Sequence, residues 1–232
     1  MSDAFPRLLH VDGYVVCQRW MPSNPSVVAA FARLVANDPG ETLFNNAGVS
    51  DDDNDRRLHQ CPLEGLLEEN AAVREFCDAL MAKLREQFGG RLTPRDMVLL
   101  WSDARCSAQR AHCDFTRELV EGLSDDEMPL GFVFALQDDT PLDVWPGAIR
   151  CFDDPGRELA HRRIVLNAGD AVFFRGDLVH AGAPFDRSNM RIHVYLDHAD
   201  VDRAENATFF MHEEPWIAER RSGRRSGPSE AH

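Results

Sequence analysis

Hydrophobic positions over about the first ninety residues repeat with helical spacing. The pair Asn24-Pro25 is typical of a helix start, and a second helical pattern runs from about residue 62 to residue 88, where Gly89-Gly90 predicts its end. The polar, acidic stretch 45–57 between the two patterns predicts a loop. The apolar stripe of the first helix consists of Val27, Val28, Phe31, Leu34 and Val35.

After residue 94 the pattern changes to short segments rich in β-branched and aromatic residues, which are typical of strands. Turn signals that contain proline or glycine separate them, and we expect turns at Pro141 and at Pro146-Gly147. Many short strands at this spacing favour a barrel or jelly roll, and helices before strands favour an α+β, mainly β fold with N-terminal helices packed on one sheet. The expected strands are 97–101, 130–136, 163–166, 171–174 and 192–196.

Length and composition indicate one soluble domain. The chain has 232 residues, and its formal net charge of -14 argues against nucleic-acid binding, which relies on Lys and Arg at the phosphates. Its apolar runs are too short to cross a bilayer, and its first residues do not have a secretion-signal pattern, which predicts a cytoplasmic protein. The six cysteines form no CxxC pair and are expected to be reduced thiols.

The charge is unevenly distributed along the chain. Residues 220–232 carry four arginines and one glutamate, which predicts a disordered basic tail. We therefore predict one domain over 1–219, with a helical part over about 1–93 and a strand-rich core over about 94–212.

The segment 109–115 carries the strongest chemical signal. On a strand, residues i and i+2 point to the same face, so His112 and Asp114 project together. His180, which follows a strand and a turn, is the best candidate for a third metal ligand. Two histidines and one carboxylate with open positions opposite are the ligand pattern of non-haem iron(II) oxygenases. The sequence therefore predicts an iron(II) site at these three residues.

Arg191 is the candidate anchor for a cosubstrate carboxylate. It lies eleven residues beyond His180 and opens a strand whose alternation places Ile192, Val194 and Leu196 on one face. Arg191 and His193 then face the interior of the barrel, where a buried arginine needs an anionic partner. The C5 carboxylate of 2-oxoglutarate would be such a partner.

The HxD motif at His112 and Asp114, the distal His180 and then Arg191 resemble the iron(II)/2-oxoglutarate-dependent dioxygenase superfamily over about residues 95–198. The chain is most similar to the phytanoyl-CoA dioxygenase-like branch, through Gln109 and the segment 140–148. The resemblance implies a double-stranded β-helix core, with iron(II), 2-oxoglutarate and dioxygen as cofactor and cosubstrates. Ala148 and the residue after it stand where that branch usually has Ser and His. Because those residues often shape the substrate pocket, the branch's specific substrates are not expected for this chain.

Four further residues are weaker candidates. Gln109 and His193 are candidate hydrogen-bond partners of the cosubstrate, with a surface position as the alternative for Gln109. Trp145 is a candidate for the substrate pocket, and core packing is its alternative. Arg187 is an alternative anchor that lies in a turn, where a solvated side chain is expected.

The resemblance implies an oxidoreductase that hydroxylates a small molecule or metabolite conjugate and releases succinate and carbon dioxide. Hydroxylation is the expected outcome because Asp114 is present, whereas halogenating relatives have a small residue at that position. Two alternatives remain open. The first is a hydroxylase of protein side chains, since the acidic protein would attract a basic peptide substrate. The second is a cupin-like metal-binding protein without turnover.

Overall fold

The computed structural model describes most of the chain between residues 4 and 211. The predicted acidic loop and the predicted basic tail lie outside the described residues, so both stay predictions. The described residues are 4–37, 40–42, 58–63, 67, 70–152, 160–198, 201 and 208–211.

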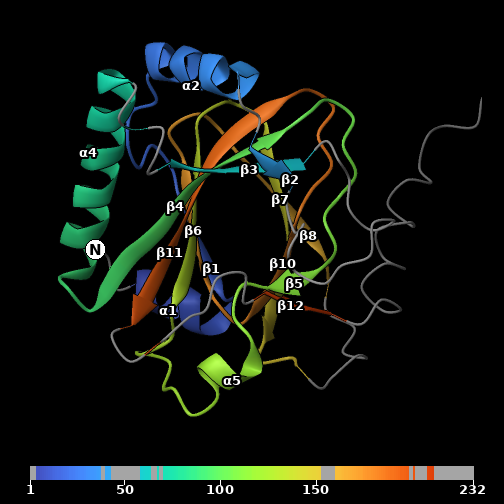
Figure 1. The fold of residues 1–232 in the computed structure, drawn as a ribbon. Helices are drawn as coiled ribbons and strands as arrows, with labels where there is room; N and C mark the ends of the chain where they lie inside the picture. The colour runs from blue at the N-terminus through green and yellow to red at the C-terminus, as the bar shows by residue number, and fades with distance from the viewer. Residues whose placement is uncertain are drawn as a thin grey trace, which may run out of the picture.

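Helices and strands alternate early in the chain, and strands dominate after residue 92 (Figure 1). The helices are α1 (Ala4–Val11), α2 (Pro25–Asn37), α4 (Ala71–Phe88) and α5 (Arg117–Val120). The strands are β1 (Tyr14–Cys17), β2 (Glu41–Thr42), β3 (Leu58–Pro62), β4 (Leu92–Ser102), β5 (His112–Cys113), β6 (Leu130–Ala135), β7 (Thr140–Ile149), β8 (Arg162–Leu166), β9 (Ala171–Arg175), β10 (Leu178–Gly182), β11 (Asn189–His198) and β12 (Phe209–Phe210).

Two antiparallel sheets face each other and form a jelly roll, which confirms the predicted fold class. The larger sheet has seven strands in the order β1-β9-β6-β11-β4-β3-β2, and the smaller has five in the order β12-β5-β10-β7-β8. Strands distant in the sequence therefore become neighbours, above all β5 and β10. Within the described residues, no helix has the combination of length and hydrophobicity needed to cross a membrane.

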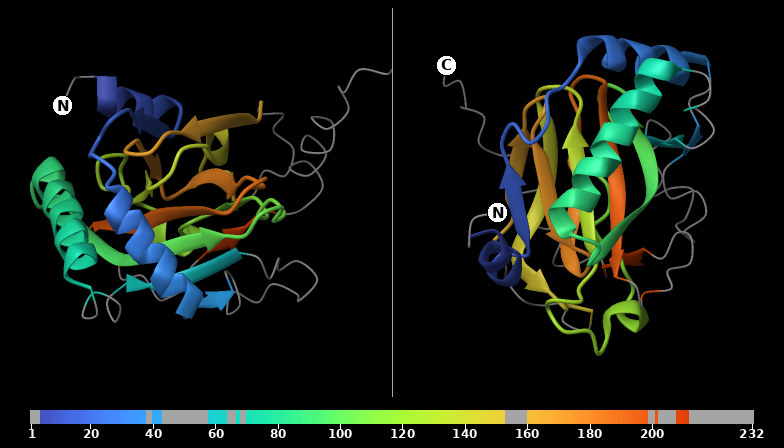
Figure 2. Two further views of the ribbon diagram at one scale, coloured as in Figure 1. Left: turned by 90° about the horizontal axis from the view of Figure 1, so that it is seen from above. Right: turned by 90° about the vertical axis from the view of Figure 1, so that its left-hand side faces the viewer.

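The main core lies between the larger sheet and the helices. Ile192, Val194 and Leu196 of β11 are fully buried there, against apolar residues of α2 and α4. Figure 2 shows α4 lying across the outer face of this sheet. The predicted alternation of β11 is thus confirmed, and the other face of the strand, with Arg191 and His193, points between the sheets.

The second predicted helix, over about residues 62–88, is confirmed over most of its length. Leu63 is helical and its carbonyl accepts from the N–H of Leu67 (3.0 Å), directly after β3 ends at Pro62. The long helix α4 begins after Asn70, whose side-chain oxygen accepts hydrogen bonds from the main-chain N–H groups of Ala72 (3.1 Å) and Val73 (3.2 Å). This N-cap satisfies donors that a helix leaves unpaired at its start. The predicted end is correct, because Gly89 adopts the left-handed conformation (φ 57°) that helix termination favours.

Pro141 and Pro146-Gly147 lie within a strand, β7, so the prediction of turns at these residues was wrong. The turn residues instead form an irregularity within the strand. His180 of β10 pairs with Val144 and Leu178 pairs with Ile149, so extra residues of β7 bulge between these two positions. Gly147, with φ 76°, accommodates this bulge, which explains why a proline-glycine pair occurs inside a paired strand.

The helical character predicted for the first ninety residues was incomplete. The strands β1 and β3 belong to the larger sheet, with β1 on β9 and β3 on β4. Both are short, and their hydrophobic alternation extends over too few residues to be distinguished from a helix or loop. Pairing with distant strands decides their conformation.

We predict that Asn70→Ala lowers the free energy of unfolding by about 1 kcal/mol, because it removes the acceptor that caps α4. Asn70→Ser keeps a capping oxygen and should recover most of the loss. Urea denaturation followed by circular dichroism measures both, and equal midpoints for the two variants would show that the cap contributes nothing.

Candidate metal centre

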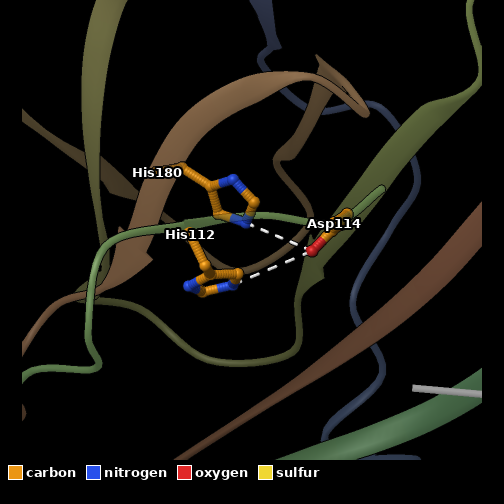
Figure 3. A group of neighbouring side chains, drawn as sticks. All are labelled: His112, Asp114 and His180. Carbon is orange, nitrogen blue, oxygen red and sulfur yellow. Dashed lines mark ion pairs between the residues drawn. The ribbon is translucent and has the colours of Figure 1, made fainter. Parts of the chain in front are cut away.

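The three predicted ligands converge on one buried point between the sheets. His112 and His180 are directly opposite each other in the β5–β10 pair, so their side chains project to the same face, with ring centroids 4.4 Å apart. Asp114 lies just beyond the two-residue strand β5 rather than on a longer strand as predicted. Figure 3 shows both imidazoles pointing at its carboxylate, and the ligand atoms of the three residues lie within 4.8 Å of one another.

Main-chain carbonyls fix the orientation of both histidine rings. The Nδ1 atom of His112 donates to the carbonyl of Arg110 (2.8 Å), and that of His180 donates to the carbonyl of Leu178 (3.0 Å). Because Nδ1 carries a proton in each ring, Nε2 is the nitrogen that faces Asp114 and would bind a metal, losing any proton that it carries in the metal-free site. Metal-binding histidines are held in this way, because the hydrogen bond at one nitrogen selects the tautomer that binds with the other.

The two oxygens of Asp114 have different neighbours. Oδ1 faces the two histidines of the triad, at 3.8 Å from Nε2 of His112 and 3.5 Å from Nε2 of His180. Oδ2 accepts a hydrogen bond from Nε2 of His193 (3.1 Å), whose ring packs edge-on against Tyr195. Asp114 is therefore oriented to offer one oxygen to a metal, while His193 holds the other.

The carboxyl of Asp114 is buried and ionised. Burial by itself raises its pKa, but the charge and hydrogen bond of His180 and those of His193 outweigh burial and hold the pKa well below its ordinary range. The site therefore supplies an anionic oxygen at neutral pH.

Gly131 of β6 gives the carboxylate the space that it occupies. A Cβ atom at this position would lie 2.7 Å from Oδ2 of Asp114 and 2.3 Å from the ring of Phe174. That ring packs against His180, with centroids 4.4 Å apart. A glycine inside an apolar strand often marks such a close approach, and this signal could have identified Gly131 from the sequence.

Two neutral imidazole nitrogens and one carboxylate oxygen suit a divalent transition metal, and the set matches the 2-His-1-carboxylate pattern of iron(II) sites. The three side chains are 4–5% exposed, so a metal there would be shielded from bulk water. Among the described residues this is the one group of His, Cys, Asp and Glu side chains with metal-binding geometry.

Arg191 is buried on the same face of β11 as His193, about 7 Å along the strand. Its Nη1 donates to Oγ of Ser102 (3.0 Å), and its guanidinium lies 4.8 Å from the ring centroid of Phe185. No carboxylate of the described chain pairs with it. Burial lowers the pKa of Arg191 to about 10, so the side chain remains cationic at neutral pH.

Gln109 is buried and joins the two segments that carry the histidines. Its main-chain N–H donates to the carbonyl of Gly182 (2.8 Å), and its side-chain oxygen accepts from the N–H of Gly182 (2.7 Å). This rules out the surface position considered for Gln109. The residue links the segment before His112 to the end of β10, two residues after His180.

The remaining candidates lie away from the triad. Trp145 packs with Val179 and Ala181 on the outer face of the smaller sheet, opposite His180, so its predicted place in a substrate pocket has no support. Arg187 is exposed, as expected for a turn. Cys113 was not a candidate; it stands between His112 and Asp114 in the sequence, and its thiol donates to the carbonyl of Asp177, while burial raises its pKa well above the ordinary value.

Comparison with solved structures confirms the fold. SnoK, a "non-heme alpha ketoglutarate dependent carbocyclase" from nogalamycin biosynthesis, matches with a TM-score of 0.62 at 17% identity, covering 91% of this chain and 97% of its own. HygX from Streptomyces hygroscopicus, solved with nickel and 2-oxoglutarate bound, matches with a TM-score of 0.58 at 10% identity, covering 86% and 88%. No protein-family model and no curated protein matches the sequence. At such identities the likeness establishes a shared jelly roll, and the phytanoyl-CoA dioxygenase-like branch stays a prediction.

We predict that His193→Leu weakens Co(II) binding by about 10–100-fold, the usual cost of removing a hydrogen-bond partner of a metal ligand. The reason is that Oδ2 of Asp114 loses its donor and the carboxylate can turn away from the triad. Anaerobic titration of the metal-free protein with Co(II), followed by absorption spectroscopy, measures the change.

Two variants separate this effect from a loss of packing. His193→Gln keeps an N–H donor and should restore affinity to within a few-fold. His161→Leu removes a histidine that pairs with the buried Asp143 at 3.0 Å in another part of the fold, and should leave Co(II) affinity unchanged. Equal affinity in His193→Leu and the unmodified protein would contradict the role of His193.

Proposed function

We propose that this protein is an iron(II)- and 2-oxoglutarate-dependent dioxygenase that hydroxylates, or otherwise oxidises, a small molecule or metabolite conjugate. His112, Asp114 and His180 hold the iron, and Arg191 binds the C5 carboxylate of 2-oxoglutarate. Bound iron supplies the activation of dioxygen that is coupled to the conversion of 2-oxoglutarate to succinate and carbon dioxide.

The observation that carries the proposal is a buried arginine without an acidic partner beside a buried metal-binding triad. Burying a charge is costly unless it is paired, and the described chain provides Arg191 with a hydroxyl and an aromatic ring but no carboxylate. A ligand carboxylate would complete the pair, because a guanidinium matches it with two parallel hydrogen bonds.

The strand β11 links the anchor to the metal. Arg191 and His193 are two residues apart on its inner face, and His193 holds Asp114. A dicarboxylate bound by Arg191 at one end therefore has its other end directed toward the triad, which suits a cosubstrate that chelates the metal. His193 donates to Asp114, so in this arrangement it orients a metal ligand rather than binding the cosubstrate as predicted from the sequence.

A small-molecule substrate is favoured over a protein by the related structures that have bound ligands. SnoN, an epimerase solved with Fe3+, alpha ketoglutarate and nogalamycin RO, matches with a TM-score of 0.61 at 17% identity, and HygX has also been solved with hygromycin B. These ligands were bound by SnoN and HygX. For this chain they support the proposal that the substrate is a small molecule.

We expect Arg191→Met to abolish succinate release from 2-oxoglutarate while metal affinity changes less than about threefold, because the variant keeps the apolar stem and removes the charge. Succinate is measured in the iron-loaded protein under air, and Co(II) affinity by anaerobic titration. Arg187→Met, which removes an exposed arginine nearby in the sequence, is the matched control and should retain activity.

The outcomes separate the proposed enzyme from a metal-binding protein without turnover. Succinate release that survives in Arg191→Met would refute the role of the anchor. Metal binding without any 2-oxoglutarate affinity in the unmodified protein would favour the cupin-like alternative.

Asp114→Ala should lower iron(II) affinity by more than about 100-fold, since it removes the one anionic donor of the triad and leaves two neutral imidazoles. Metal content after anaerobic gel filtration measures this loss. An unaltered ratio of iron to protein would show that the metal binds elsewhere.

A further inference from the structure

Arg110 places a positive charge close to the proposed metal centre. Its carbonyl accepts the hydrogen bond that orients His112, and its guanidinium lies 5.3 Å from the ring centroid of Phe210. The ring of Phe210 is 6.0 Å from that of His112, because β12 pairs with β5 and puts the two residues opposite each other. The guanidinium and a proposed metal ligand therefore both lie close to the same aromatic ring.

The guanidinium of Arg110 is largely unpaired within the described chain. It offers five N–H donors, and its one hydrogen bond there runs from Nη2 to the carbonyl of Met211 (3.3 Å). Its Nε is buried without an acceptor, and no acidic residue of the described chain pairs with it. A buried donor without a partner favours any ligand that supplies an acceptor after a small rotation of the side chain.

Neither Arg110 nor Arg191 pairs with an acidic residue of the described chain, although the protein is acidic. The chain has 39 acidic residues against 25 Lys and Arg, so counter-ions are abundant. Arg163 forms a two-point pair with Asp143, and Arg175 does so with Asp177. Arg191 and Arg110, which both lie close to the triad, have no such partner in the described part of the chain.

We propose that Arg110 and Phe210 form a substrate subsite for an oxyanion, a carboxylate or phosphate, carried by a flat apolar group. The inference rests on the proposed function, which assigns Arg191 to the cosubstrate and so leaves Arg110 for the substrate. The apolar group packs against Phe210, which is half-buried, and the oxyanion pairs with the guanidinium beyond it. The reacting carbon then lies on the side of the ring that faces His112.

Three probes of matched shape test the subsite: 3-phenylpropionate, 2-phenylethyl phosphate and the neutral 3-phenylpropionamide. Binding to the full chain, loaded with Zn(II) and saturated with 2-oxoglutarate so that Arg191 is occupied, is measured by ligand-observed NMR. We expect at least one anion to bind about 10-fold or more tightly than the amide, as hydrogen bonds to charged groups allow. The tighter of the two anions identifies the oxyanion.

Variants and a paramagnetic metal locate the binding site. Arg110→Met keeps the stem over Phe210 and should reduce the preference for the anion to within about twofold, whereas Arg187→Met should leave it unchanged. Replacing Zn(II) with Mn(II) should broaden the aromatic proton signals of the bound anion. Equal affinity for anion and amide, a preference that persists in Arg110→Met, or no broadening by Mn(II) would each overturn the subsite.

The failure of the subsite and the failure of the proposed function give different results. If the protein is not a dioxygenase, it releases no succinate, yet the anion preference that depends on Arg110 can still be present in the Zn(II) form. If only the subsite is wrong, succinate release continues and Arg110→Met has no effect on anion binding.

Discussion

The site depends on one buried carboxylate that three imidazoles surround. Asp114 is ionised because His180 and His193 stabilise its charge more strongly than burial destabilises it. An anionic oxygen of this kind is a suitable ligand for a divalent metal. The two oxygens of Asp114 have different neighbours, which come from different sheets. The smaller sheet directs His112 and His180 at Oδ1, and the larger sheet directs His193 at Oδ2.

The jelly roll is the framework that makes this convergence possible. Pairing of β5 with β10 places His112 opposite His180, and Gln109, three residues before His112, is hydrogen-bonded to Gly182, two residues after His180. The helices on the outer face bury one side of β11 and so fix the orientation of its other side. Arg191 is thereby held inside the barrel, where burial removes its guanidinium from water and makes the charge costly unless an anion pairs with it.

Charge pairing separates structural arginines from those available to ligands. The buried Arg175 pairs with Asp177, whereas Arg191 and Arg110 have no carboxylate partner among the described residues. In a protein with a large excess of acidic residues, this difference reflects where the carboxylates lie rather than how many there are, and it is the basis on which we assign anionic ligands to Arg191 and Arg110.

The sequence by itself predicted the jelly-roll class, the face of β11 that packs against the helices, and the three residues that the structure brings together in the triad, because strand alternation and ligand chemistry are local properties. Tertiary structure alone decided the rest. The start of α4, the bulge in β7 and the strand β1 follow from caps and from pairing with distant strands. The contact of His193 with Asp114, and the absence of an acidic partner for Arg110 among the described residues, likewise depend on segments that meet only when the sheets close. Local spacing carries no information about such contacts.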